Sequence, residues 1–206
     1  DPKWLVMQDF FRQKDECVDL LYQAFPFTIV RHPDFEADDI IAHYARFHKD
    51  DDVVIASGDS DFIQLLTDEN PQIKLYHPIK KDFVQPPDYD YLEWKAIRGD
   101  ATDNVPGIPR HGDKTAEKIV RDPDLFEKKL EDPDWEAQFL RNLSLIRIDK
   151  LTRAEINGIH VSEPGLKEQV IKEAFEGWEF GSVLNEKPWE KFIKTFEEIV
   201  EGESFA

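Results

Sequence analysis

The first half of the chain alternates between two hydrophobic patterns. Amphipathic helices are predicted over residues 9–25 and 36–47, and strands over 27–31, 52–57 and 73–78, with a turn or two of helix starting at Asp59. The run at 52–57 is continuous and β-branched, which is typical of a strand covered on both faces. Helices and strands in this order favour an α/β fold with a Rossmann-like, mainly parallel sheet.

From about residue 88 onward nearly every segment has a helical pattern. The predicted helical segments are 89–97, 113–120, 124–130, 134–148, 166–175 and 189–200. We therefore expect residues 1–97 to belong to the α/β core and residues 98–206 to form a helical domain.

The composition is that of a globular chain of modest size. With 206 residues, 40% of them hydrophobic, it can bury a sizeable core. It holds no run of about 18 apolar residues that would span a bilayer, and its start does not resemble a secretory signal, so we expect a cytoplasmic protein without a membrane partner. Cys17 is the only cysteine, which excludes a disulfide or a thiolate zinc site within the chain. We expect Cys17 to be a small buried side chain of the first helix.

The net charge is opposite to that of most nucleic-acid-binding proteins. Asp and Glu number 44 and Lys and Arg 26, which gives −18. Between residues 98 and 121, however, five basic residues accompany four acidic ones, a local charge of +1 (5 − 4). This segment is a local island of positive charge.

Carboxylates gather at the ends of predicted elements in three groups. They are Glu36, Asp38 and Asp39 at the start of the helix 36–47, Asp59 and Asp61 directly after the strand 52–57, and Asp100 and Asp103 just past the helix 89–97. Ligands of open parallel sheets bind beyond the carboxyl ends of the strands, so the first two groups should converge there.

Converging carboxylates repel one another unless a cation lies among them, because each raises the pKa of its neighbours. Oxygen ligands without nearby Cys or paired His favour Mg²⁺ or Mn²⁺ over zinc. So many acids suggest two ions, about 4 Å apart, of the kind that stabilise the attacking and leaving oxygens in phosphodiester cleavage.

Each acidic group also has another interpretation. Acids at a helix start cap the helix and compensate its dipole, worth roughly 0.3 to 1 kcal/mol each, and acids in turns are common turn formers. Asp59 and Asp61 also match the D-x-D arrangement of aspartyl-phosphate phosphatases, which would leave the other acids unexplained. A calcium loop starting at Asp100 is excluded because its twelfth residue is His111, and no zinc hydrolase motif is present.

A glycine-containing turn follows the third acidic group. Gly107 and Gly112 surround a bend, and Lys114 and Thr115 lie at the start of an amphipathic helix. Glycines let backbone N–H groups approach a phosphate, while the helix N-terminus and the lysine add positive charge. Such contacts position a duplex without reading its sequence. The alternative is an ordinary connection between two helices with glycine caps.

Four motifs together resemble the signatures of the structure-specific 5′-nuclease family, which includes flap endonucleases and the 5′-nuclease domains of bacterial DNA polymerases. They are EADD (36–39), SGDSDF (57–62), GDATDNVPGI (99–108) and GDKTA (112–116). YHPIKKDFV (76–84) and FLRNLSLIRID (139–149) resemble the phage branch, which includes the ribonuclease H of T-even phages. The resemblance covers nearly all of residues 25–150.

The resemblance implies a PIN-like nuclease core and a helical domain with a helix-three-turn-helix. It implies first-metal ligands that act in catalysis through the ion (Glu36, Asp38 and Asp59), an outer carboxylate (Asp39) and a second-metal group (Asp61, Asp100 and Asp103). Duplex phosphates would bind the turn through Gly107, Arg110, His111, Gly112, Lys114 and Thr115. Some members also hold a K⁺ ion there; this chain has GIPRHGDK where relatives often have GIPGIGPK.

The resemblance further implies Mg²⁺- or Mn²⁺-dependent hydrolysis at 5′ ends, flaps or RNA primers in DNA replication and repair. Nicked or branched duplex DNA and RNA–DNA hybrids would be the substrates, with a sliding clamp and a single-strand-binding protein as partners, in the host cytoplasm for a phage protein. Family members also have an N-terminal metal-binding strand and a basic helical arch, which the 206 residues do not contain. We therefore expect the chain alone to be inactive. The alternative is a duplex-DNA-binding module with an incomplete metal site.

Overall fold

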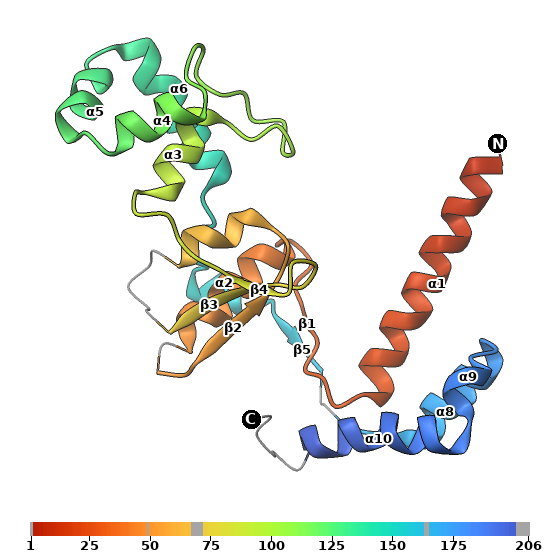
Figure 1. Cartoon of the computed structure of the whole chain (residues 1–206). Helices are drawn as coiled ribbons and strands as arrows, with labels where there is room; N and C mark the ends of the chain where they lie inside the picture. The colour runs from red at the N-terminus through yellow and green to blue at the C-terminus, as the bar shows by residue number, and fades with distance from the viewer. Residues whose placement is uncertain (1, 49, 67–71, 163–164, 201–206) are drawn as a thin grey trace. The chain divides into compact units, whose positions relative to one another are not determined.

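The computed structural model describes residues 2–48, 50–66, 72–162 and 165–200 (Figure 1). The chain forms two compact units, one made of residues 1–33 with 158–206 and the other of residues 34–157. In the described ranges, no helix combines the length and the apolar character needed to cross a membrane.

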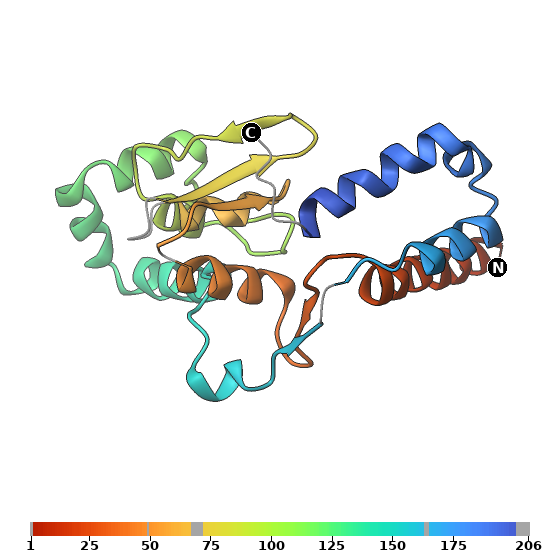
Figure 2. The same ribbon diagram turned by 90° about the horizontal axis from the view of Figure 1, so that it is seen from below.

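The first unit is mainly helical. Its elements are α1 (Pro2–Ala24), β1 (Val30–Arg31), β5 (His160–Val161), α8 (Glu168–Gly177), α9 (Gly181–Leu184) and α10 (Glu186–Val200). Its core joins the end of α1 to α8 and α10 through Leu20, Ala24, Phe25, Ile171, Phe175, Trp189 and Ile193. The helix predicted over 9–25 is thus confirmed, and it begins earlier, at Pro2; Figure 2 shows α1 beside α8.

The strand predicted over 27–31 is shorter than expected and has a different partner. Val30 lies opposite Val161 in an antiparallel pair of β1 with β5, so this strand does not join the sheet of the second unit. Ser162 extends the pairing, because its amide N–H donates to the Ile29 carbonyl at 2.9 Å and its hydroxyl accepts from the Ile29 N–H at 2.8 Å. These bonds occupy the backbone groups just before β1.

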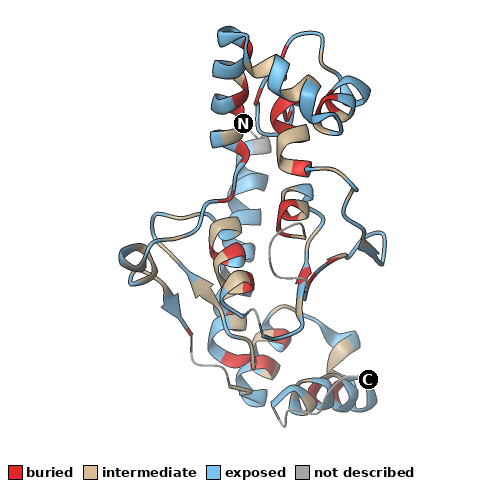
Figure 3. Ribbon diagram, turned by 90° about the vertical axis from the view of Figure 1, so that its left-hand side faces the viewer, coloured by how far each residue is buried: buried red, intermediate tan, exposed pale blue. Residues whose placement is uncertain are grey.

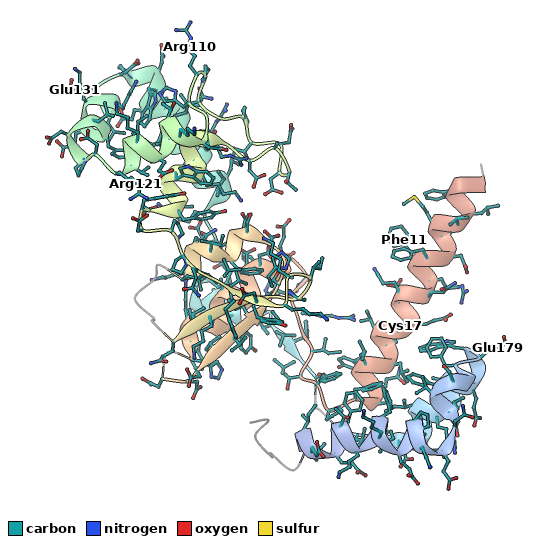
Figure 4. All side chains as sticks on the ribbon, in the orientation of Figure 1. Phe11, Cys17, Arg110, Arg121, Glu131 and Glu179 are labelled. Atoms are coloured by element: carbon teal, nitrogen blue, oxygen red, sulfur yellow. The ribbon has the colours of Figure 1, made fainter. Side chains whose placement is uncertain are left out.

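Cys17 is exposed, which corrects the expectation that it is buried. The buried face of α1 begins only at Leu20, where the helix reaches the core of its unit. Before that point even large apolar side chains such as Phe11, labelled with Cys17 in Figure 4, are exposed. The hydrophobic pattern therefore predicted the helix but not the extent of its packing.

The second unit combines a small sheet with most of the helices. Its elements are α2 (Ala37–Phe47), β2 (Val53–Ala56), the 3₁₀ helix η1 (Ser60–Leu65), β3 (Ile73–His77), β4 (Asp82–Val84), α3 (Tyr91–Arg98), α4 (Asp113–Val120), α5 (Pro123–Leu130), α6 (Pro133–Ile146) and α7 (Arg153–Ile156). The sheet order is β2-β3-β4, with β2 and β3 parallel and β3 and β4 antiparallel. The α/β class is confirmed, and the described sheet is mixed rather than mainly parallel.

Aspartates begin three of these helices. Asp90, Asp122 and Asp132 each accept hydrogen bonds from backbone N–H groups in the first turn of α3, α5 and α6. A proline follows Asp122 and Asp132 directly, where its missing N–H costs nothing. These local signals explain why the helical pattern after residue 88 predicted α3, α5 and α6. The short helices α7 and α9 and the strand β5 were not predicted.

Two hydrophobic clusters form the core of the second unit, and their buried residues are coloured red in Figure 3. One lies around β2, β3 and η1, and the other joins α3, α4 and α6. The buried Gln64 connects η1 to the end of α6, since its side chain donates to the Ile146 carbonyl at 3.2 Å and accepts from the Ile148 N–H at 2.9 Å. The sheet and these helices therefore belong to one unit, residues 34–157. This unit continues across residue 97, where the sequence analysis expected a domain boundary.

Candidate metal centre and nucleic-acid interface

The first acidic group lies at the start of α2. Glu36 is the N-cap of α2, and its N–H donates to the Asp39 carboxylate at 3.3 Å. Asp39 therefore has the helix-capping role that was the alternative to metal binding for the acids at this helix start. Asp38 is different. Burial raises its pKa, and the negative charges of Asp59, Glu36, Asp39 and Asp103 raise it further, in that order. One carboxylate therefore feels acids from all three groups.

The second acidic group lies in the loop between β2 and η1. The Asp59 N–H donates to the Ser57 hydroxyl at 3.1 Å, and the Asp59 carboxylate accepts from the Asp61 N–H at 2.9 Å. The η1 helix then buries Phe62 and Leu65 in the core. This anchoring fixes both carboxylates at the end of a core strand, as the sequence predicted.

The third acidic group lies on a short closed loop after α3. The N–H of Asp100 donates to the Val105 carbonyl at 2.9 Å, and the Val105 N–H donates back at 2.7 Å. The Asp100 carboxylate also accepts from the Thr102 N–H at 2.8 Å. The loop thus presents a buried Asp100 and an exposed Asp103 from a rigid base.

A triad of carboxylates combines the second and third groups. Asp61, Asp100 and Asp103 each offer one oxygen within 4.8 Å of the others. The Lys95 ammonium contacts Asp61 and lies 2.5 Å from Asp100 Oδ2. Burial acts to raise the pKa of Asp100, but the hydrogen bonds from Lys95 and the Thr102 N–H outweigh it, so the pKa is lowered.

The acidic site comprises all seven acids that the sequence singled out. They are Glu36, Asp38, Asp39, Asp59, Asp61, Asp100 and Asp103. Their donor atoms are carboxylate oxygens, which suit hard divalent cations such as Mg²⁺ or Mn²⁺. Within the described residues, no Lys or Arg forms an ion pair with Asp38 or Asp59, so the donor set fits a cation on that side.

Glycine lets two backbone segments approach closely beside the acidic site. A Cβ on Gly107 would lie 2.0 Å from the Arg98 carbonyl oxygen, and Gly99 has a φ of +83°, in the region that favours glycine. The Ile108 N–H donates to the Ile97 carbonyl at 2.8 Å, which holds the same approach. By contrast, a Cβ on Gly112 would meet nothing within 4 Å. The two glycines of the predicted phosphate-binding turn therefore have different surroundings.

Ion pairs neutralise two of the five basic residues in the positive island. Arg98 pairs with Asp113 at 2.6 Å, and Arg121 pairs with Asp88 and Glu117. The others, Arg110, Lys114 and Lys118, are exposed and form no ion pair within the described part of the chain. Figure 4 shows Arg110 pointing outward from its loop. These three side chains carry the positive surface of the turn.

The remaining residues of the turn are held locally. Gly112 caps α4, and its carbonyl accepts from the Thr115 N–H at 2.9 Å, leaving the Thr115 side chain exposed. His111 Nδ1 lies 2.8 Å from the Pro109 carbonyl oxygen, and its ring packs edge-on against Trp135. Their roles in DNA binding stay predictions.

Sequence reasoning did not single out two buried polar residues of this region. Lys95 lies one turn after the buried Tyr91 on α3. The sequence did contain a signal for its burial, because this lysine occupies a core-facing position of the helical pattern, five residues before Asp100. Asn142 is fully buried, and its side chain donates to the carbonyls of Ala96 and Pro106, both at 2.8 Å. A lone Asn in a helical pattern gives no such signal, because its two acceptors come from distant segments.

Comparison with known proteins agrees with the geometry. A family described as "5'-3' exonuclease, N-terminal resolvase-like domain" matches residues 6–93. DNA polymerase I of Bacillus subtilis is 33% identical over 127 residues, which cover 55% of this chain and 14% of that protein. The thermostable DNA polymerase I of Thermus aquaticus is 29% identical over 205 residues, covering 87% of this chain and 23% of that protein.

These alignments cover a small part of each relative. The chain spans 14% of the length of the Bacillus protein and 23% of the Thermus aquaticus protein. In the thermostable DNA polymerase I of Thermus filiformis, the 27% identical stretch covers 24% of the length. The phage branch and the ribonuclease H resemblance stay predictions.

Proposed function

Because this chain belongs to the 5′-nuclease family, we propose that it is part of a divalent-metal-dependent nuclease that cleaves phosphodiester bonds at 5′ ends, flaps or RNA primers during DNA replication and repair. The observation that carries the proposal is the convergence of carboxylates from three separate segments. Asp61, Asp100 and Asp103 each offer an oxygen within 4.8 Å of the others, and Asp59, Glu36, Asp39 and Asp103 act on the partly buried Asp38. A folded protein keeps such repulsion at a cost in stability, which a bound cation offsets.

Two groups of residues in the acidic site would each bind one ion. Asp38 and Asp59, with Glu36, would hold the first Mg²⁺ or Mn²⁺, and the triad of Asp61, Asp100 and Asp103 would hold the second. A bound divalent ion supplies Lewis-acid stabilisation of the charge that develops on the scissile phosphate. The closed loop at 100–105 and the anchored start of η1 keep the carboxylates in place, so little reorganisation is needed.

The turn before α4 would position the duplex. Of the five basic residues between 98 and 121, Arg110, Lys114 and Lys118 are exposed and form no ion pair with a described residue, and the N-terminus of α4 adds partial positive charge beside Lys114. These groups contact phosphates rather than base edges, so binding follows the shape of a nicked or branched duplex. RNA–DNA hybrids are further candidate substrates, a K⁺ ion is a candidate ligand of the turn, and a clamp and a single-strand-binding protein are candidate partners.

A second candidate function is duplex binding without cleavage. The observation that favours it is the Lys95 ammonium, which already pairs with two of the three triad carboxylates. A site filled by its own lysine has less need of an ion. Both candidates predict binding to branched DNA, and they differ in turnover.

The test is cleavage of a labelled 5′-flap duplex by the intact protein that contains this chain, with Mg²⁺ or Mn²⁺. Asp59→Asn and Asp100→Asn should each abolish cleavage and leave duplex affinity equal or tighter, because each removes a negative charge near phosphate. Asp124→Asn, at an exposed position of α5, is the matched control and should cleave normally. If both variants lost duplex binding and also thermal stability, the two aspartates would have a structural role rather than a metal-binding one. Duplex binding without cleavage by the wild type would support the second candidate.

A further inference from the structure

Lys95 is the most buried charged residue of the acidic site. Its side chain is 3% exposed, and its ammonium contacts the carboxylates of Asp61 and Asp100. Lysines are almost never fully buried unless they are paired, because a desolvated ammonium is costly. The two carboxylates are thus the partners that permit this burial.

The backbone fixes Lys95 in this position. Its neighbours Ala96 and Ile97 are fully buried in the helical core, and its carbonyl accepts from the Gly99 N–H at 2.7 Å at the end of α3. Gly99 then turns the chain with its positive φ, and Asp100 follows directly. The lysine and the aspartate therefore face each other across one tight helix end.

The two parts of the acidic site differ in charge balance. In the described ranges, no Lys or Arg side chain forms an ion pair with Asp38 or Asp59. In the triad, by contrast, the Lys95 ammonium contacts both Asp61 and Asp100. Among the described residues, the triad therefore has a paired cation and the Asp38–Asp59 part has none.

We propose that Lys95 is the built-in cation of the Asp61–Asp100–Asp103 triad and that it sets how tightly the triad binds a divalent ion. An ion enters the Asp38–Asp59 part first, since none of the described ammonium groups pairs with these two carboxylates. Binding at the triad requires the ammonium to give up at least one carboxylate, which weakens the second ion. Lys95 acts here as a positioning residue, through the carboxylates it holds. The inference rests on the proposed function, because it takes the acidic site to receive divalent ions.

The experiment is a titration of the purified intact protein with Mn²⁺. Binding is measured by calorimetry and by the loss of the electron paramagnetic resonance signal of free Mn²⁺. Lys95→Met keeps a long side chain and removes the charge, so the weaker of two Mn²⁺ affinities should rise at least tenfold while the stronger stays within about threefold. Lys95→Arg keeps the charge and should bind like the wild type. Lys74→Met, which removes an exposed lysine paired with Asp52 at 3.0 Å, is the matched control and should leave both affinities unchanged.

Lys95→Met leaves two carboxylates without their partner, and the variant can lose its fold in the absence of ions. In that case the midpoint of thermal unfolding is measured against Mn²⁺ concentration, because an ion that binds only the native state raises it. The proposal predicts a steeper rise for Lys95→Met than for the wild type. A rise no steeper than that of the wild type overturns it.

The outcomes separate this inference from the proposed function. A wild type that binds two Mn²⁺ ions and a folded Lys95→Met variant with unchanged or weaker second affinity overturn the role of Lys95 alone. A wild type that takes up no Mn²⁺ at millimolar concentration overturns the metal-dependent function as well. A tenfold gain in Lys95→Met, absent in Lys95→Arg and Lys74→Met, supports both.

Discussion

Replacing Gly107 by alanine should unfold the turn that links the acidic site to α4. The added Cβ would lie 2.0 Å from the Arg98 carbonyl oxygen and 2.7 Å from its carbonyl carbon, whereas ordinary contacts begin at 3.4 Å. One backbone segment must therefore move by about 1.4 Å (3.4 − 2.0). The segments cannot separate freely, because the Ile108 N–H bonds the Ile97 carbonyl and Asn142 bonds the Pro106 carbonyl.

The magnitude follows from these contacts. Overpacking costs about 1–3 kcal/mol, and each hydrogen bond that is lost adds about 1 kcal/mol, so Gly107→Ala should lower the free energy of unfolding of its unit by about 2–5 kcal/mol. Gly112→Ala is the matched control, since a Cβ there meets nothing within 4 Å and the change should stay within about 1 kcal/mol. Urea unfolding followed by circular dichroism measures both. Equal stabilities for the two variants would refute the close approach of residues 98 and 107.

Two further predictions concern charge. Lys114→Ala should weaken binding equally for all duplex sequences and lower the slope of log affinity against log salt by about one unit, as for one phosphate contact, whereas Lys128→Ala on α5 should not; an unchanged slope removes Lys114 from the interface. Burial lowers the pKa of the His43 imidazole below its ordinary value of 6.5. The neutral imidazole therefore contributes to the stability of the folded protein above pH 6.5, and this contribution is lost as the pH falls through the folded-state pKa. His43→Gln should therefore reduce the loss of unfolding free energy between about pH 7 and about pH 5, by less than about 1 kcal/mol because the ring is partly solvated; an unchanged pH profile would contradict this.

Local signals explain what the sequence could predict. An amphipathic pattern together with a capping residue determines most of a helix, and the helix predicted over 113–120 has the same limits as α4. The acids at element ends were also visible, because Asp59 follows an apolar strand and Glu36 precedes an apolar stripe. Their convergence needed only the rule that ligands gather at strand ends.

Pairings between distant residues explain what the sequence could not predict. Val30 pairs with Val161, 131 positions along the chain (161 − 30), and no local pattern in a two-residue strand indicates that partner. Lys95 is hidden in a helical segment whose pattern looks complete without it, and only the folded loop brings Asp61 to its ammonium. The buried Gln64, which connects η1 to the end of α6, is likewise recognisable only from its two distant backbone partners.

We propose that carboxylates from three segments together bind two divalent cations. Crystals of the intact protein grown or soaked with Mn²⁺ would locate the ion directly through its anomalous scattering. We expect an anomalous peak in contact with the carboxylates of Asp38 and Asp59, and a weaker one at the Asp61–Asp100–Asp103 triad. Mn²⁺ bound only at exposed surface acids such as Asp51, with Asp38 and Asp59 ordered and without a peak, would contradict it.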